Sequence, residues 1–236
     1  MGARRWLLLG PVRIQPSEIA KIGTILVLAR WFAKVNPDRE MGLRDLIIPA
    51  ILTGIPTILI ILEPDLGTGL LILLIFLVMC FYRKLKWKTI GILALIALLS
   101  GGIMYKFGLK EYQRKRISTF LNPGQDAENH TDFVFSIFNE EHGFFGSMFL
   151  ISLYIILLFR YLWLATSVPR IFDSIVMIGV LSLVFWHTFI NMSMVMGLMP
   201  IVGLPLPFMS YGGSSLLTFG ICNGIATSIS NSRNLF

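Results

Sequence analysis

The chain has 236 residues, of which 55% are hydrophobic and only 14% are charged, and its formal net charge is +7. A soluble domain carries about 25% charged residues, so this composition excludes a soluble enzyme and indicates an integral membrane protein. No run of about ten residues alternates apolar and polar side chains, which favours an all-α membrane helix bundle. Nucleic acid is excluded as a partner, because the basic residues alternate with apolar segments instead of lying on one soluble face.

Apolar segments near the length of about 20 residues that crosses a bilayer occur about seven times. They predict spans at residues 17–34, 45–62, 66–82, 88–107, 134–160, 171–199 and 213–230. Together they form a single integral-membrane domain, residues 1–236, with a polar loop at 108–133.

Polar residues mark the starts of the first and third spans. Pro16, Ser17 and Glu18 suit the first turn of a helix, where N–H groups lack partners. Two carboxylates and a proline at 63–65 cannot lie within one lipid-facing helix, so we predict a tight turn there, with Asp65 as the N-cap of the next helix. The like charges in this turn require a nearby cation or metal, and Lys21 is a candidate counter-charge.

Glu18 and Lys21 are three residues apart and share a helix face. They form either an ion pair near the membrane surface, with Lys21 reaching to the headgroups, or a polar notch facing the bundle interior. Ionisable residues within spans usually face an interior or a cavity. Arg5 and Arg13 precede this pair. Phospholipid phosphates are one partner for them, but their position favours the pyrophosphate of a substrate.

The longest polar run between apolar segments covers residues 112–133. Basic residues lie at its entry: Lys110, Arg114, Lys115 and Arg116. Near its end lies Asp132, which is either an N-cap for the following helix or a functional acid. Capping explains an aspartate there, but it does not explain the basic residues that precede it in the same loop. A basic segment and a carboxylate at a bilayer surface are suited to chemistry on an anionic lipid.

Two features of the last third point to the bundle interior. His187 and Asn191 are four residues apart on one face, and we expect them to make interhelical hydrogen bonds. Residues 200–215 are too rich in proline and glycine for a helix. Irregular backbone at membrane depth is tolerated where it is buried in protein or lines a cavity, so this stretch is expected to wall a site. Ser214 and Ser215 are also candidate caps for the last helix.

The loop charges predict the topology. The loop at 83–88 is short and strongly basic, which places it in the cytoplasm by the positive-inside rule. The N-terminus, the turn at 63–65, the 108–133 loop and the 200–212 loop then lie outside. This gives the outer face a large number of cations, which an anionic substrate outside the membrane would explain.

These residues resemble the SEDS family of bacterial cell-wall polymerases, and its RodA branch more than its FtsW branch. The matching stretches, in family order, are GARRW (2–6), VRIQPSEIAK (12–21), EPDLGTG (63–69), YQRKRI (112–117), NPGQD (122–126), NHTDFVF (129–135), EEHGFFG (140–146) and GLPLPFMSYGGSSL (203–216).

The resemblance implies a multi-pass enzyme of the bacterial cytoplasmic membrane, a peptidoglycan glycosyltransferase that polymerises lipid II on the extracytoplasmic side. It implies a class B penicillin-binding protein as partner and Mg²⁺ or Mn²⁺ as the cation, whose ligands stay unassigned. The essential acid of the family falls on Asp132. Its other important polar positions fall on Arg5, Arg13, Glu18, Lys21 and Asp65, and we add Arg114 and Arg116 as candidates to hold pyrophosphate.

The chain departs from the family pattern in two places. The spans before GARRW are missing, and only Ala127 and Glu128 separate NPGQD from Asn129, where family members have a longer loop. The chain is therefore either a shortened member or part of a longer one. Two alternative functions remain open: a flippase for a lipid-linked precursor, and a non-catalytic scaffold for the crosslinking partner.

Overall fold

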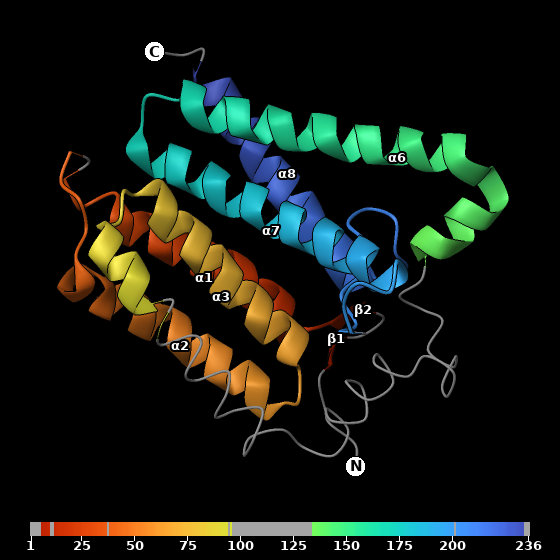
Figure 1. The fold of residues 1–236 in the computed structure, drawn as a ribbon, viewed down its shortest axis with the longest axis horizontal. Helices are drawn as coiled ribbons and strands as arrows, with labels where there is room; N and C mark the ends of the chain where they lie inside the picture. The colour runs from red at the N-terminus through yellow and green to blue at the C-terminus, as the bar shows by residue number, and fades with distance from the viewer. Residues whose placement is uncertain are drawn as a thin grey trace.

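The computed structural model describes residues 6–9, 12–36, 38–93, 95, 134–200 and 202–233. Within these ranges the named elements are β1 (Leu7–Leu9), β2 (Val12–Ile14), α1 (Pro16–Phe32), the 3₁₀ helix η1 (Leu43–Leu46), α2 (Ile47–Leu62), α3 (Leu66–Tyr82), α6 (Val134–Ser167), α7 (Ile171–Val195) and α8 (Gly213–Arg233). Residues 87–93 are also helical. Figure 1 shows these helices as a single bundle.

The predicted all-α membrane bundle is confirmed, and six of the predicted spans correspond to α1, α2, α3, α6, α7 and α8. The span predicted at 88–107 begins in a described helical stretch, and most of it lies outside the described residues. Among the described helices, Leu43–Leu62, Val134–Ser167 and Ile171–Val195 are each long and apolar enough to cross a membrane. α3 is apolar too, but shorter, with 17 residues.

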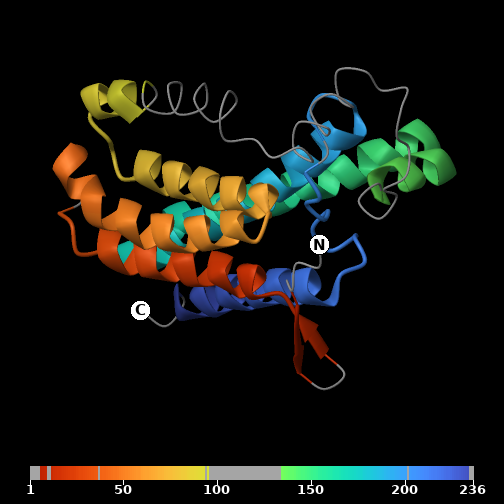
Figure 2. The same ribbon diagram turned by 90° about the horizontal axis from the view of Figure 1, so that it is seen from below.

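The structure corrects the prediction at two places. β1 and β2 form an antiparallel ribbon, with Leu8 opposite Arg13, which projects from the bundle beside the start of α1 (Figure 2). Strands of three residues are too short for an alternating pattern to reveal them. The span predicted at 134–160 is part of a longer helix, α6, which bends at Gly143, where φ is 62° and ψ is −161°. Glycine adopts this backbone conformation without steric cost.

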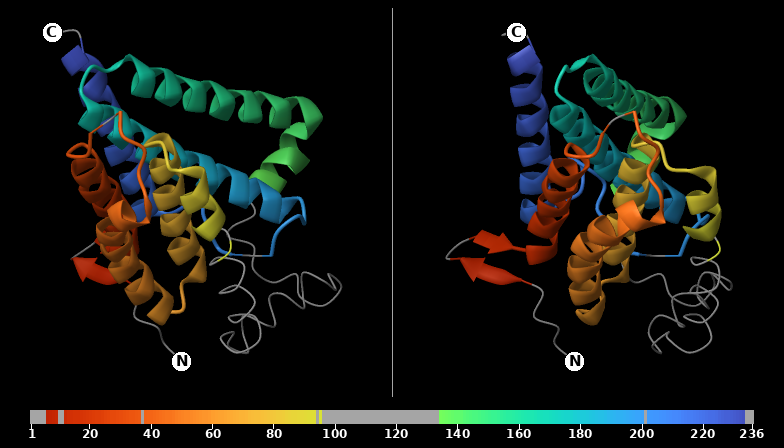
Figure 3. Two further views of the ribbon diagram at one scale, coloured as in Figure 1. Left: turned by 60° about the vertical axis from the view of Figure 1, so that its left-hand side comes forward. Right: turned by 90° about the vertical axis from the view of Figure 1, so that its left-hand side faces the viewer.

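α7 lies at the centre of the bundle. In Figure 1 the helices α6, α7, α3 and α2 follow one another across the view, and each contacts the next. α1 and α8 lie side by side behind this row, and both contact α7 (Figure 3). α7 is buried along most of its length, whereas apolar side chains of α2 and α6 face outward. Lipid tails are as apolar as these side chains, so such faces suit a bilayer.

The loops divide between two ends of the bundle. At one end the chain after α1 meets the chain after α3, where Met41 pairs with Leu85 in a short β-bridge. At the other end the start of α1, the turn between α2 and α3 and the start of α8 are joined by hydrogen bonds. This division agrees with the alternation of ends that the spans predict. The side of the membrane on which each end lies stays a prediction.

A glycine allows α1 and α7 to approach closely. A Cβ atom at Gly179 would lie 2.4 Å from Cγ2 of Ile25, well inside van der Waals contact. Gly179→Ala is therefore expected to destabilise the protein by about 1–3 kcal/mol, because the two helices must separate or Ile25 must leave its rotamer. Thermal unfolding in detergent measures this.

The matched control is Gly220→Ala in α8, where the added Cβ meets nothing within 4 Å. Gly179→Ala should also cost less in an Ile25→Ala background than in the unchanged protein, because the added Cβ then no longer meets Cγ2 of Ile25. Equal stability of the Gly179 and Gly220 variants would contradict the close packing of α1 on α7.

Candidate active site

A buried charge network joins α1 to α7. Nζ of Lys21 lies 2.8 Å from Oε1 of Glu18 and 2.9 Å from Nε2 of His187. Lys21 and His187 are 0% exposed and Glu18 is 4% exposed. This burial excludes the alternative in which Lys21 reaches the membrane surface. It agrees with the other alternative, in which Glu18 and Lys21 form a polar notch that faces the bundle interior.

The lysine fixes the proton position on the histidine ring. An ammonium group only donates, so Nε2 of His187 accepts the hydrogen bond from Lys21. The other ring nitrogen, Nδ1, then carries the proton and donates to the carbonyl oxygen of Pro205 at 3.1 Å. His187 is therefore a neutral bridge between the ion pair on α1 and the chain that follows α7.

Of the stretch 200–215 that was predicted not to be helical, residues 202–212 form irregular backbone, whereas α8 already begins at Gly213. Side chains of α6 and α7 bind carbonyl groups of this segment. Nδ2 of Asn191 donates to the carbonyl of Leu204 at 2.8 Å, and the hydroxyl of Tyr154 donates to that of Pro207. Together with the bond from His187 to Pro205, these contacts satisfy backbone groups that lipid cannot. The predicted interhelical hydrogen bond is confirmed for His187, which bonds to Lys21 of α1, whereas Asn191 bonds to the carbonyl of Leu204 in this segment. That the segment lines a substrate site stays a prediction.

Asp65 and Gln15 together connect the starts of α1, α3 and α8 at the same end of the bundle. Its carboxylate accepts from the backbone N–H of Thr68 at 3.2 Å and from its hydroxyl at 2.9 Å, which confirms the predicted N-cap of α3. Nε2 of Gln15 lies 3.4 Å from Oδ2 of Asp65, and the backbone N–H of Gln15 donates to Ser214 of α8 at 3.0 Å. The suggested counter-charge Lys21 instead pairs with Glu18, because it points from α1 toward α7.

The first turn of α3 packs directly on the irregular segment. A Cβ atom at Gly67 would lie 2.5 Å from Cγ1 of Val202, so only glycine allows this approach. Phe135, at the start of α6, packs in one cluster with Leu206. The Asp65 cap, the residues 202–206 and the start of α6 therefore meet at one end of the bundle. The charge network lies one helical turn further along α1, since Glu18 follows Gln15 by three residues.

The structure places only part of the predicted site. Glu18 and Lys21 touch each other, and Asp65 is linked to them through Gln15 and the first turn of α1. Only the backbone of Arg13 is described, in β2 opposite Leu8. Four predicted residues lie outside the described part of the chain: Asp132, Arg5, Arg114 and Arg116.

His187, Gln15 and Ser214 were not predicted as site residues. The spacing of His187 from Asn191 marked a polar face, but nothing local indicates that its partner is Lys21, 166 residues away in sequence. Within the described residues, Oε2 of Glu18 is buried without a hydrogen-bond partner. This oxygen is available to accept a hydrogen bond from a bound molecule.

The family profile of FtsW, RodA and SpoVE, described as "Cell cycle protein", matches residues 1–129 and 127–235. The chain belongs to this family. The match confirms the SEDS expectation drawn from the sequence stretches. The two matched segments overlap at residues 127–129.

Curated members of the family are similar over nearly the whole chain. Peptidoglycan glycosyltransferase MrdB of Escherichia coli K12 is 35% identical over 271 residues, covering 99% of this chain and 72% of the relative. MrdB of Helicobacter pylori 26695 is 34% identical, covering 100% of this chain and 71% of the relative. These names confirm the expected enzyme class, a glycosyltransferase.

Solved structures share the fold. A chain in a peptidoglycan synthase complex that coordinates polymerisation and crosslinking is 34% identical with a TM-score of 0.86, covering 99% of this chain and 74% of that chain. Rod shape determining protein RodA of Thermus thermophilus is 34% identical with a TM-score of 0.76, covering 98% of this chain and 70% of that chain. This SEDS-family chain is thus a membrane-embedded helix bundle of the RodA type.

Proposed function

We propose that this SEDS-family chain is a peptidoglycan glycosyltransferase that polymerises lipid II into glycan strands at the outer face of the bacterial cytoplasmic membrane. The observation that carries the proposal is the buried network of Glu18, Lys21 and His187, bonded to an irregular wall, in a chain 35% identical to a named peptidoglycan glycosyltransferase. Buried ionisable groups within spans are costly and mark functional interiors.

In the proposed reaction Asp132 is the general base. Its carboxylate takes the proton from the 4-hydroxyl of the acceptor sugar, and the oxygen attacks the anomeric carbon of the donor. The bond between that carbon and the pyrophosphate oxygen breaks, and undecaprenyl pyrophosphate leaves with the electron pair. A single displacement of this kind inverts the configuration at the anomeric carbon.

The leaving pyrophosphate needs positive charge, which we assign to Arg5, Arg13, Arg114 and Arg116. A guanidinium group presents a planar fork of donors that matches phosphate oxygens, and its charge stabilises the negative charge that develops on the leaving group. Glu18, Lys21 and Asp65 would line the substrate cleft. The free Oε2 of Glu18 supports this role, because it can accept from a sugar hydroxyl or an amide.

A divalent cation, Mg²⁺ or Mn²⁺, is part of the proposal through the chemistry of pyrophosphate, which it would neutralise as a Lewis acid. The described residues do not fit a protein-held ion, since no group of three or more His, Cys, Asp and Glu side chains among them suits one. No ligand is assigned, and no step above depends on the ion.

A class B penicillin-binding protein is the proposed partner. The similarity to a chain of a peptidoglycan synthase complex, at a TM-score of 0.86, supports this assignment. Such a partner would crosslink the glycan strands as they leave the membrane surface.

Purified protein and labelled lipid II test the function. We expect glycan polymer that separates as a ladder on a gel, and addition of EDTA followed by Mg²⁺ or Mn²⁺ measures whether the reaction requires the cation. Movement of lipid II across vesicles without polymer would instead support a flippase. Absence of both, with binding to a penicillin-binding protein retained, would support a scaffold.

A further inference from the structure

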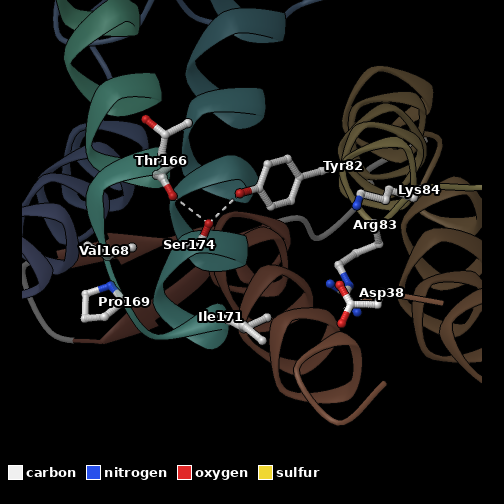
Figure 4. A pocket seen from close by; sticks show the side chains of 10 residues that line it. Asp38, Tyr82, Arg83, Lys84, Thr166, Val168, Pro169, Ile171 and Ser174 are labelled. Atoms are coloured by element: carbon white, nitrogen blue, oxygen red, sulfur yellow. Dashed lines mark hydrogen bonds between the residues drawn. The ribbon is translucent and has the colours of Figure 1, made fainter. Parts of the chain in front are cut away.

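A polar cavity lies at the end of the bundle opposite the candidate active site. It has a volume of about 350 Å³, which is within the range of about 300–1,000 Å³ of small-molecule pockets. Its walls come from the chain after α1, the end of α3, the end of α6 and the start of α7 (Figure 4). The residues that line the cavity, among them Tyr82, Arg83 and Ser174, take no part in the site proposed above.

Arg83 provides a buried positive charge in this cavity. It is 6% exposed, and its Nη2 donates to the carbonyl of Val35 at 2.9 Å. Within the described residues its Nε is buried without a hydrogen-bond partner, and no carboxylate lies within 4.0 Å of its guanidinium. Burial lowers the pKa of Arg83, but a guanidinium remains charged at neutral pH. A buried charge without an acid partner favours an anion.

Lys84 adds a second cation to the same wall. It is exposed and has φ of 57°, a left-handed conformation that a lysine rarely adopts. The carboxylate of Asp38 also lines the cavity, at its exposed rim, and opposes an anion there. The two cations therefore outnumber the one acid among the charged groups that line the cavity.

The hydroxyl groups of the cavity hold its walls together. Ser174 donates to the carbonyl of Ala165 at 2.6 Å, so its oxygen accepts from the hydroxyl of Tyr82, also at 2.6 Å. The third hydroxyl of the lining, that of Thr166, donates to the carbonyl of Trp163 at 3.0 Å. All three hydroxyl protons are used, and Tyr82 and Ser174 cannot donate to an anion without breaking the bonds that join α3, α6 and α7. The donors for a ligand are therefore Arg83 and Lys84.

Tryptophan residues at this end of the bundle indicate the depth of the cavity in the membrane. Trp31 lies in the last turn of α1, Trp163 near the end of α6, and Trp87 is 85% exposed just after α3. Tryptophan gathers at the boundary between lipid tails and water, where headgroup phosphates also lie. We propose that this cavity binds a phosphate group, and that the group is the headgroup phosphate of an anionic phospholipid in the adjoining leaflet.

Native mass spectrometry of the detergent-solubilised protein tests the site. Phosphatidylglycerol is titrated in, and Arg83→Gln and Lys84→Asn are compared with the unchanged protein. Asparagine removes the charge and tolerates the left-handed backbone at this position. Each variant should bind the first lipid about tenfold more weakly, because a charge-assisted hydrogen bond or charge contact is lost.

Lys86→Gln is the matched control, since Lys86 is an exposed cation of the same loop that does not line the cavity. It should leave the affinity unchanged. An equal loss in Lys86→Gln, or no loss in Lys84→Asn, would overturn the site and indicate general attraction to basic loops. Because Arg83 also binds Val35, the Lys84 variant decides the result if Arg83→Gln does not fold.

Inorganic phosphate distinguishes the source of the group. If the ligand is a lipid, phosphate at matched ionic strength should not raise the unfolding temperature, whereas phosphatidylglycerol should. If phosphate alone raises it, and does so in the unchanged protein but not in Lys84→Asn, the site binds free phosphate and the chemistry of the proposal stands. Stabilisation by neither would overturn it.

Discussion

Replacement of Asp132 by asparagine is expected to slow glycan polymerisation by about 10²–10⁴-fold while the protein remains folded. This factor is the usual contribution of a positioned general base. The asparagine side chain has nearly the same shape as aspartate but cannot accept the proton of the acceptor hydroxyl. The initial rate of polymer formation from labelled lipid II measures the effect, and thermal unfolding in the same detergent checks the fold.

Glu128→Gln is the matched control, because it removes a carboxylate from the same loop four positions earlier. It should keep the rate within a few-fold of that of the unchanged protein. A folded Asp132→Asn variant with a rate close to that of Glu128→Gln would remove Asp132 from the mechanism. The family membership would stand, since it rests on the whole chain.

The second large effect is expected at the buried network. Lys21→Met leaves the carboxylate of Glu18 buried without its cation, and removal of one partner of a buried ion pair costs about 3–5 kcal/mol of unfolding free energy. His187 also loses the donor to its Nε2. Addition of Glu18→Gln should recover much of this stability, because the uncompensated charge is then gone. Denaturation in detergent measures each variant.

The exposed pair of Arg39 and Asp45, at 3.3 Å, provides the control. The side chain of Arg39 is 67% exposed, so Arg39→Met should change stability by only about 0–1 kcal/mol. If Lys21→Met were no more destabilising than Arg39→Met, the ion pair of Glu18 and Lys21 would not be buried away from water. The Glu18→Gln, Lys21→Met double variant separates stability from activity: stable but inactive protein would assign a role to the charges themselves.

The geometry suggests how the network affects the site. His187 connects the ion pair on α1 to the carbonyl of Pro205, and Asn191 holds the neighbouring carbonyl of Leu204. Polar side chains of α6 and α7 therefore hold the irregular segment in addition to its own backbone hydrogen bonds, which link Met209 and Ser210 to the carbonyl of Leu206. A change in charge at Glu18 or Lys21 would alter this wall, which makes the network a positioning device as well as part of the proposed cleft.

The sequence by itself determined the features that depend on local chain chemistry. The length of the apolar runs predicted the helices, because a bilayer requires a minimum span. Two carboxylates and a proline at 63–65 predicted the turn, and Asp65 caps α3 as expected. The density of proline and glycine predicted that residues 200–215 are not helical, which is confirmed for residues 202–212, whereas α8 already begins at Gly213. Each of these inferences involves neighbours along the chain, whose geometry the backbone fixes.

Only the tertiary structure decided which polar groups meet. Lys21 had plausible partners at Glu18 and in the Glu63–Asp65 turn, and the structure pairs it with Glu18 and with His187 of a distant helix. Among the described residues, no carboxylate lies within 4.0 Å of the guanidinium of Arg83. This arrangement, like the contact of Gln15 with Asp65, also depends on helices that are far apart in sequence. The reason is that the rotation and spacing of the helices set these contacts. Rotation and spacing follow in turn from close packing at points such as Gly179 on Ile25, and no local sequence pattern encodes that packing.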